Sequence, residues 1–232
     1  MKFTAVAFDL DGTLYPNFRF YYRLVPFLLK EHRLLRALDM ARRRLRETGA
    51  YDGDFYELQA HLMAELLKKP AGEVKARVER LIYRGWEPHF KKIGLFPHVK
   101  ETLDAFRDRG IKLGILSDFP PLAKLDNLNI GKYWDAVVCS EQSGRLKPDP
   151  KPFLDLSTLM KVRPEELLYV GNSVAYDVAG AFGAGMKTAL VFPRWRKAPV
   201  FSVKEGESGR IRRQAPDFVF YDYRQLRDYV LN

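Results

Sequence analysis

The stretch Val6-Ala7-Phe8-Asp9-Leu10-Asp11-Gly12-Thr13-Leu14-Tyr15 decides how this chain folds. An apolar run, typical of a buried strand, ends in two carboxylates one residue apart, and Gly-Thr follows directly. We expect Asp9 and Asp11 to lie where this strand opens into a turn. Two carboxylates this close repel each other unless a cation lies between them or one of them is protonated. Both arrangements suit chemistry on phosphate esters.

Three further polar motifs follow along the chain. They are Ser117-Asp118 after Ile111–Leu116, Lys147 within Arg145-Leu146-Lys147-Pro148, and Gly171-Asn172-Ser173-Val174-Ala175-Tyr176-Asp177 after Leu167–Val170. Each motif comes at the carboxyl end of a predicted strand. Ligands of parallel sheets bind at that edge, so we expect the four motifs to form one site.

The order of the predicted elements indicates an α/β fold. Strands are predicted at Phe3–Phe8, Lys112–Leu116, Ala136–Cys139, Leu167–Val170, Thr188–Phe192 and Asp217–Phe220, with helices near 98–109, 121–128, 150–160, 174–185 and Tyr223–Leu231. This alternation implies a three-layer, Rossmann-like parallel sheet covered by helices on both faces. We assign residues 1–15 and 96–232 to this core.

Residues 16–95 contain no convincing strand. Apolar side chains recur there at helical spacing in three stretches, Leu34 to Leu45, Phe55 to Leu67 and Val74 to Ile82. We therefore expect an α-helical domain inserted between the first two motifs. The basic segment 194–213 is interpreted as a surface loop.

The four motifs, in this order, resemble those of the haloacid dehalogenase (HAD) superfamily, whose first motif has the form Asp-x-Asp-Gly-Thr. The resemblance covers nearly the whole chain and is to phosphatases of the phosphoglycolate phosphatase type, which carry a small helical cap over the active site. In that family the cap contributes much of the substrate selectivity. The chain departs from the pattern at Asn172, where many members have an aspartate.

The resemblance implies a phosphatase that forms an aspartyl-phosphate. Asp9 would be the nucleophile, and Asp11 would act first as general acid and then as general base. Ser117, Asp118 and Lys147 would bind the phosphoryl group. From the sequence alone, Ser117 can also be a helix cap, and Lys151 is a nearby rival of Lys147.

The resemblance also implies Mg²⁺ as cofactor. Its ligands would be Asp9, Asp11 through the backbone carbonyl, Asn172 and Asp177. An amide oxygen at position 172 lacks the charge of a carboxylate, so we expect a functional but weakened metal site.

Alternatives to the phosphatase remain open. Dehalogenases of the superfamily lack an acid at the position of Asp11, which argues for phosphoryl transfer. A sugar phosphomutase shares the same motifs. Asn172 leaves room for a non-catalytic binding or regulatory protein on a HAD scaffold.

The chain of 232 residues has 39 Lys and Arg against 29 Asp and Glu, a formal net charge of +10. Much of the excess lies between 16 and 95, including Arg42-Arg43-Arg44-Leu45-Arg46. We interpret it first as a solvated helix face, then as steering of an anionic substrate, and last as a nucleic-acid surface. No nucleic-acid-binding motif accompanies the charge, so nucleic acid is the least expected partner. The cap that the resemblance implies would restrict the entry of large substrates, so we expect a small phosphorylated metabolite as partner.

Composition sets the remaining expectations. The hydrophobic fraction of 47% and charged fraction of 29% are typical of a globular protein. No apolar stretch has the length needed to span a bilayer, and no signal segment is recognised, so we expect no membrane partner. The single cysteine, Cys139, excludes an internal disulfide and fits a cytoplasmic protein. Monomer and homodimer both stay open.

Overall fold

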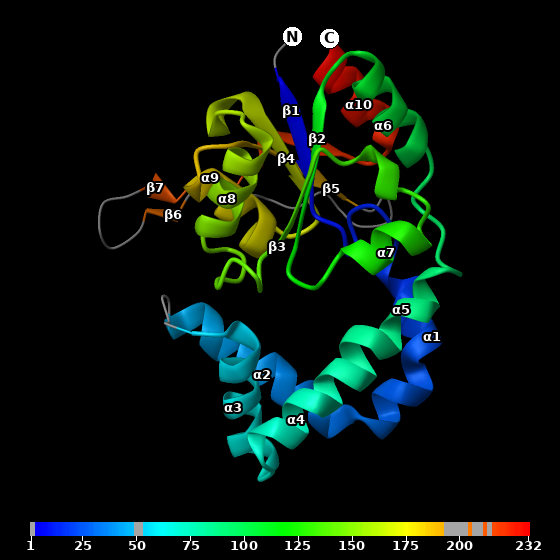
Figure 1. Ribbon diagram of the computed structural model, residues 1–232. Helices are drawn as coiled ribbons and strands as arrows, with labels where there is room; N and C mark the ends of the chain where they lie inside the picture. The colour runs from blue at the N-terminus through cyan, green and yellow to red at the C-terminus, as the bar shows by residue number, and fades with distance from the viewer. Residues whose placement is uncertain (1–2, 49–52, 193–203, 206–210, 213–214) are drawn as a thin grey trace.

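The computed structural model describes residues 3–48, 53–192, 204–205, 211–212 and 215–232. At its centre is a six-stranded sheet in the order β3-β2-β1-β4-β5-β8, and every neighbouring pair runs parallel (Figure 1). The strands are β1 (Ala5–Phe8), β2 (Lys112–Ser117), β3 (Ala136–Cys139), β4 (Leu167–Gly171), β5 (Lys187–Val191) and β8 (Phe218–Phe220). The predicted α/β fold with a parallel sheet is confirmed.

Strand β1 shows why the sheet is covered on both faces. Val6 and Phe8 belong to the core cluster that contains residues of α6 (Val99–Asp108) and α10 (Tyr223–Leu231). Ala5 and Ala7 belong to the cluster formed with α8 (Lys151–Met160) and α9 (Ala179–Gly183). Alternate side chains of a strand point to opposite faces, so a strand that is apolar at every position needs a helical layer on each side.

Most predicted elements end within two residues of the observed ones. β3 and α10 have the predicted bounds, and β1 begins at Ala5 instead of Phe3. The helix expected near 174–185 is divided into a π-helical turn (Val174–Val178) and α9, and the Ser173 side chain caps it by accepting from the Tyr176 amide. Between β2 and β4 the structure also describes α7 (Leu122–Asn127) and the 3₁₀ turns Gly131–Tyr133 and Pro164–Glu166.

In the part of the chain between β1 and α6 that the structure describes, five helices occur. They are α1 (Asn17–Lys30), α2 (His32–Thr48), α3 (Phe55–Leu67), α4 (Ala71–Val78), which continues into a π-helical turn (Glu79–Tyr83), and α5 (Arg84–Phe90). We call α1 to α5, with this turn, the inserted helices. They lie beyond the carboxyl ends of the central strands (Figure 1). The bounds 16–95 for a cap domain stay a prediction.

The predicted loop 194–213 lies mostly outside the described residues. Two short strands are described within it, β6 (Lys204–Glu205) and β7 (Ile211–Arg212), and they pair antiparallel, which the sequence did not predict. Among the helices that the structure describes, none combines the length and apolar character needed to cross a membrane.

Candidate active site

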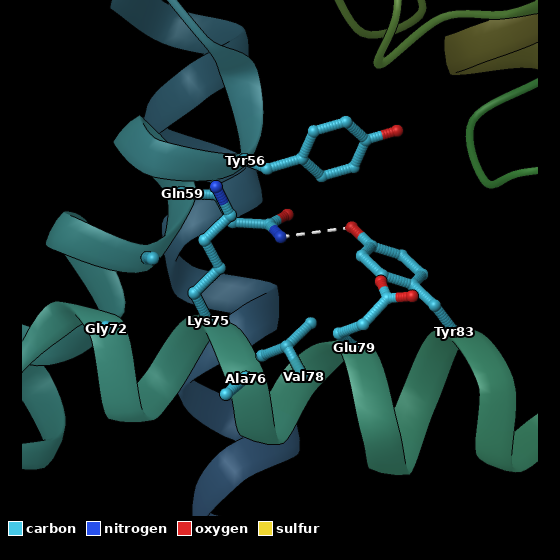
Figure 2. A pocket seen from close by; sticks show the side chains of 9 residues that line it. Tyr56, Gln59, Gly72, Lys75, Ala76, Val78, Glu79 and Tyr83 are labelled. Atoms are coloured by element: carbon cyan, nitrogen blue, oxygen red, sulfur yellow. Dashed lines mark hydrogen bonds between the residues drawn. The ribbon is translucent and has the colours of Figure 1, made fainter.

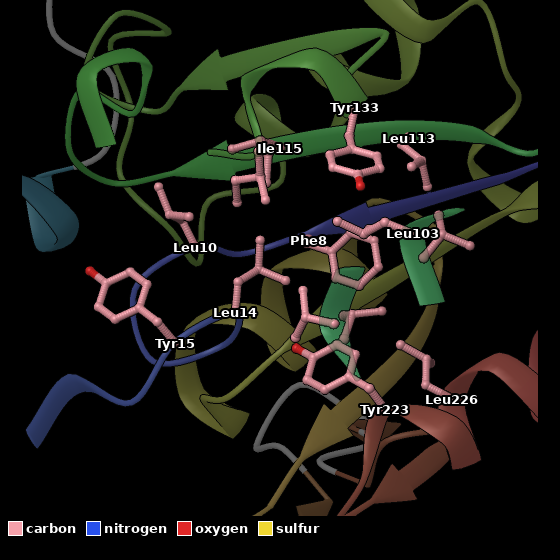
Figure 3. Packing of buried hydrophobic residues seen from close by; sticks show 14 of the residues in the cluster. Phe8, Leu10, Leu14, Tyr15, Leu103, Leu113, Ile115, Tyr133, Tyr223 and Leu226 are labelled. Atoms are coloured by element: carbon pink, nitrogen blue, oxygen red, sulfur yellow. The ribbon is translucent and has the colours of Figure 1, made fainter. Parts of the chain in front are cut away.

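The loop after β1 is anchored in the hydrophobic core. Leu10 and Leu14 are buried in the same cluster as Phe8, and Figure 3 shows them beside side chains of β2 and α10. The Tyr223 hydroxyl of α10 donates to the Thr13 carbonyl at 2.5 Å. Because these residues hold the loop from inside, the intervening Asp9 and Asp11 are fixed at the carboxyl edge of the sheet.

Asp9 is buried and held at both oxygens. Its Oδ1 accepts from Lys147 Nζ at 2.7 Å, and its Oδ2 accepts from Thr13 Oγ1 at 2.7 Å. Burial raises the pKa of Asp9 to about 7; Lys147 opposes the rise, whereas Asp177 and Asp11 add to it. Asp9 is thus a fixed carboxyl group that takes up a proton near neutral pH.

Lys147 joins two of the predicted motifs. Its ammonium, also buried, lies 2.7 Å from Asp9 Oδ1 and 2.7 Å from Asp177 Oδ1. Burial lowers the pKa of Lys147, but the Asp177 and Asp9 carboxylates outweigh it and raise this pKa well above its usual value. Lys147 therefore stays charged. The rival Lys151 is exposed and pairs with Asp155 on α8, away from these acids.

Asp177 faces inward to Lys147 and to the backbone of its own loop. Its Oδ2 accepts from the amides of Asn172 and Ser173 at 3.1 and 3.0 Å. With Oδ1 on Lys147, both oxygens are engaged, so Asp177 fixes the loop after β4 around the Lys147 ammonium. Its role as a metal ligand stays a prediction.

Asp11 has different partners from Asp9. Lys124 Nζ of α7 contacts both of its oxygens, at 2.9 and 2.6 Å, and the Tyr15 hydroxyl donates to Oδ1. The Asp11 carbonyl accepts from the side-chain amides of Asn172 and Asn17, each at 3.2 Å. The two carboxylates of the first motif thus have separate cations and do not share one.

Ser117 and Asp118 close the next side of the site. Ser117 is buried, and its Oγ accepts from the Phe119 amide at 3.2 Å. Asp118 Oδ1 accepts from Ser140 Oγ at 2.5 Å and from the Lys147 amide at 3.1 Å. Asp118 therefore ties the loop after β2 to the loop that carries Lys147.

Two arginines of α2 reach the same loops. Arg46 donates to Asp118 Oδ2 and to the Lys147 carbonyl, both at 2.8 Å, and Arg42 donates to the Asp118 carbonyl at 2.9 Å. Although burial raises the pKa of Asp118, Lys147, Arg42 and Arg46 together bring it below its usual value. The interpretation of this arginine run as a solvated face is wrong for buried Arg42 and half-buried Arg46. It holds for Arg43 and Arg44, which are exposed.

Arg42 also belongs to a closed polar ring between the inserted helices and the core. It pairs with the buried Glu141, which accepts from the Tyr83 hydroxyl at 3.0 Å. Gln59 donates to the same hydroxyl at 3.1 Å, as Figure 2 shows, and accepts from Arg42 at 3.4 Å. Tyr83 and Gln59 line a cavity of about 400 Å³ within the inserted helices, and none of the predicted site residues lines it.

The residues around Asp11 fit a Mg²⁺ ion by their chemistry. The Asp9 carboxylate and the Asp11 carbonyl bring hard oxygen atoms, the donors that Mg²⁺ prefers. Asn172 also carries such an oxygen, Oδ1, although Nδ2 is the atom that faces the Asp11 carbonyl in this structure. Mg²⁺ is commonly held by one or two carboxylates and completes its shell with water and substrate phosphate. In the described part of the chain, no cluster of three or more His, Cys, Asp or Glu side chains is suited to a metal. A site here therefore depends on the carbonyl and amide oxygens as well.

The approach of two side-chain amides to the Asp11 carbonyl requires a glycine at position 12. Its φ is +89°, and a Cβ built on it would lie 2.1 Å from Asn172 Nδ2 and 2.5 Å from Asn17 Nδ2. A side chain at this position would push both amides away from the Asp11 carbonyl.

The structure adds residues that the sequence analysis did not select: Thr13, Arg42, Arg46, Lys124 and Glu141. Thr13 was visible in the Asp-x-Asp-Gly-Thr motif. Arg42 lies on the same helical face as the buried Leu38 and Leu45, so its burial had a signal in the helical phase. Lys124 is 113 positions from Asp11, and no pattern in the sequence indicated that the two would be in contact.

Comparisons with known proteins identify the family and several relatives of this chain. The model of the family described as haloacid dehalogenase-like hydrolase matches residues 3–185. A glyceraldehyde 3-phosphate phosphatase of Methanopyrus kandleri is 31% identical over 207 residues, which cover 81% of this chain and 83% of that protein. A phosphoglycolate phosphatase of Salmonella choleraesuis is 30% identical over 200 residues, covering 78% and 77%. A crystal structure of a HAD phosphatase from Thermococcus onnurineus aligns with a TM-score of 0.63 at 26% identity, over 98% of both chains.

Proposed function

The chain belongs to the haloacid dehalogenase-like hydrolase family and is a phosphoric monoester hydrolase, and we propose that it works through a phospho-enzyme formed on Asp9. The substrate is a small phosphorylated metabolite. Its similarity to relatives named for glyceraldehyde 3-phosphate and for phosphoglycolate supports this substrate class.

The observation that carries the proposal is the pairing around Asp9. Lys147 and Thr13 hold one oxygen each at 2.7 Å, so the carboxylate is fixed before substrate arrives. A nucleophile held in one orientation gains rate because its positional entropy is already lost. Lys147 opposes the protonation of Asp9 and so favours the charged nucleophile, and it neutralises charge on the phosphoryl oxygens nearby.

The reaction has two steps. An Asp9 oxygen attacks phosphorus, the bond to the leaving oxygen breaks, and Asp11 gives its proton to that oxygen to release the alcohol. Water then attacks the phosphorus of the aspartyl-phosphate, Asp11 takes a proton from the water, and phosphate leaves with Asp9 restored. The Ser117 hydroxyl donates to a phosphoryl oxygen. Asp118 keeps that loop in place, because its side chain accepts hydrogen bonds from Arg46 and from the Lys147 amide.

Mg²⁺ is the proposed cofactor. The Asp9 carboxylate, the Asp11 carbonyl and Asn172 would hold it, with Asp177 bracing their loop. When bound, the ion neutralises the anionic oxygens of the nucleophile and of the phosphoryl group. The inserted helices are proposed to act as the cap, since Arg42 and Arg46 join them to the loops that carry Asp118 and Lys147.

Phosphate release tests the proposal. Wild type and Asp9→Asn are assayed with p-nitrophenyl phosphate and a panel of phosphorylated metabolites, in Mg²⁺ and in EDTA. We expect release that needs Mg²⁺ and is lost in Asp9→Asn. Isomer formation without phosphate release would identify a phosphomutase, and a folded wild type inactive in both assays would leave a non-catalytic binding protein.

A further inference from the structure

The helix α10 places one buried side chain against the loop after β1. Tyr223, the first residue of this helix, is 2% exposed, and its hydroxyl donates to the Thr13 carbonyl at 2.5 Å. Figure 3 shows this hydroxyl directed toward the loop that carries Leu14. Burial raises the pKa of Tyr223 well above its usual value, so the hydroxyl keeps its proton and stays a donor. Two residues 210 positions apart in the sequence are thus joined directly.

Tyr223 is itself held in place from several sides. Its carbonyl accepts from Thr102 Oγ1 of α6 at 3.1 Å. Its ring meets the Phe220 ring edge to face, with the centroids 5.2 Å apart. Asp222 and Gln225 form a capping box at the start of α10, which fixes the first turn of the helix. Because its backbone and its ring are both held, Tyr223 offers the loop after β1 a donor in a fixed position.

Thr13 passes this constraint on to Asp9. Thr13 is fully buried, and its Oγ1 donates to Asp9 Oδ2 at 2.7 Å. The same residue therefore accepts from Tyr223 through its backbone and donates to Asp9 through its side chain. A loop that is released at the Thr13 carbonyl can turn, and this turn moves Oγ1 away from the Asp9 carboxylate.

The orientation of the Asp9 carboxylate depends on the bond from Thr13. Lys147 holds Oδ1 at 2.7 Å, and Thr13 holds Oδ2. A carboxylate held at one oxygen can still turn about the bond to its Cβ, whereas one held at both oxygens cannot. Attack on phosphorus needs an aimed oxygen, and a misplacement of about 1 Å can lower a rate about 100-fold. The contact with Thr13 therefore bears on the rate of attack.

The helix that supplies Tyr223 lies outside the part of the chain that the family model matches. That match covers residues 3–185, and α10 spans Tyr223–Leu231. We infer that Tyr223 is a positioning residue for phosphoryl transfer, which acts through Thr13 to orient Asp9. This inference rests on the proposed function, because it takes Asp9 as the nucleophile.

Single-turnover kinetics test the inference. With enzyme in excess over p-nitrophenyl phosphate, release of p-nitrophenol reports the attack by Asp9 separately from the later hydrolysis. Tyr223→Phe removes only the hydroxyl. We expect it to lower the maximal rate roughly tenfold and to change the half-saturating enzyme concentration by less than about twofold, since orientation serves attack more than binding. The control Tyr133→Phe loses a hydroxyl bond to Asp104 within the same hydrophobic cluster and should keep the wild-type rate.

A double-mutant cycle separates positioning from a general loss of structure. Thr13→Val removes the hydroxyl that contacts Asp9, and we expect the rate to fall at least about tenfold. Adding Tyr223→Phe to Thr13→Val should lower the rate no further, because both changes act on one contact. In Thr13→Ser, which keeps a hydroxyl, Tyr223→Phe should again cost roughly tenfold. Losses that multiply in Thr13→Val/Tyr223→Phe, or an unchanged rate in Tyr223→Phe, overturn the inference.

Hydrogen exchange gives a readout that needs no turnover. The amides of Thr13 and Leu14 both donate to the Leu10 carbonyl, at 3.3 and 3.2 Å. In EDTA, exchange over residues 9–15 should be roughly tenfold faster in Tyr223→Phe than in wild type and unchanged in Tyr133→Phe. This result supports the hold of Tyr223 on the loop even if wild type releases no phosphate. Equal exchange in all three proteins overturns the inference even if wild type is an active phosphatase.

Discussion

The ammonium of Lys147 lies 2.7 Å from Asp9 Oδ1, although the two residues are 138 positions apart in the sequence. The same ammonium lies 2.7 Å from Asp177. The end of β1, the π-helical turn after β4 and the loop after β3 therefore meet at one buried cation. Both the stability and the chemistry of the site depend on that charge.

Lys147→Met leaves Asp9 and Asp177 facing each other without a cation. Breaking a buried pair costs about 3–5 kcal/mol, so we expect a loss of that size in the free energy of unfolding, with loss of phosphate release. Urea denaturation and the release assay measure the two effects. Lys151→Met is the control, because this lysine is exposed and its helical pair is worth less than ~0.5 kcal/mol. Equal losses in the two variants would contradict the assignment of Lys147.

Asp9 makes stability depend on pH. Its pKa in the folded protein is about 7, against a usual value of 3.8, so the folded state holds a proton that the unfolded chain releases between these values. The stability that this proton contributes is present below about pH 4 and is lost as pH rises through about 7. Asp9→Asn lacks this titration. The measurement is the free energy of unfolding of both proteins in EDTA. The value for Asp9→Asn minus that for wild type should rise from about pH 5 to about pH 7. A difference that stays constant with pH would contradict the raised pKa of Asp9.

Arg42 and Arg43 are neighbours with opposite environments. Arg42 is buried and pairs with buried Glu141, whereas Arg43 is exposed and pairs with Asp39 one turn away. We expect Arg42→Ala to lower the free energy of unfolding by about 3 kcal/mol or more, because Glu141 is left buried without its cation. Arg43→Ala should change it by less than ~0.5 kcal/mol. Thermal and urea unfolding of both variants check this, and similar values for the two would refute the bridge.

The sequence predicted the core well because its signals there are local. β1 is apolar at all its positions, and Tyr223–Leu231 has the spacing of an amphipathic helix. The sequence of each element is therefore enough to predict which of its side chains are buried. Asp9 and Lys147 were found because each stands in a recognisable motif. The Lys124 contact depends on where α7 is placed in space, and no property of its neighbours in sequence encodes that distance. Arg42 and Arg43 differ only in which side of α2 they occupy: one side packs on the core and the other faces solvent. In a run of consecutive arginines the sequence does not show which of them lies on the packed side.

Gly12 permits the amides of Asn17 and Asn172 to reach the Asp11 carbonyl. We expect Gly12→Ala to cost at least ~2 kcal/mol, through its positive φ and the close contacts of the new Cβ, and to weaken Mg²⁺ binding. Gly72→Ala is the matched control. It lies in α4 with nothing within 4 Å of the added carbon, so it should be neutral or stabilising by up to ~1 kcal/mol. Denaturation curves should therefore show a clear loss of stability for Gly12→Ala and no loss for Gly72→Ala.

Asn172→Asp converts an amide at the proposed metal site into a carboxylate. We expect the Mg²⁺ concentration for half-maximal phosphate release to fall roughly tenfold, or about 1.4 kcal/mol of binding free energy. Calorimetric titration with Mg²⁺ gives the same quantity without turnover. Asn129→Asp, at an exposed residue, controls for the added charge. An unchanged Mg²⁺ affinity in Asn172→Asp would remove this residue from the ligand set.

The central position of β1 has a consequence for synthesis on the ribosome. Its neighbours pair Ala5 with Lys112 on one side and with Leu167 on the other. Strand β1 thus gains its first partner only after all the inserted helices have been made, and its second far later. Contacts this distant in sequence slow folding and leave apolar strands open to aggregation meanwhile. Ala5–Phe8 stays without either partner strand until Lys112–Ser117 has been made, so the yield in cells should depend on chaperones that bind early and release late.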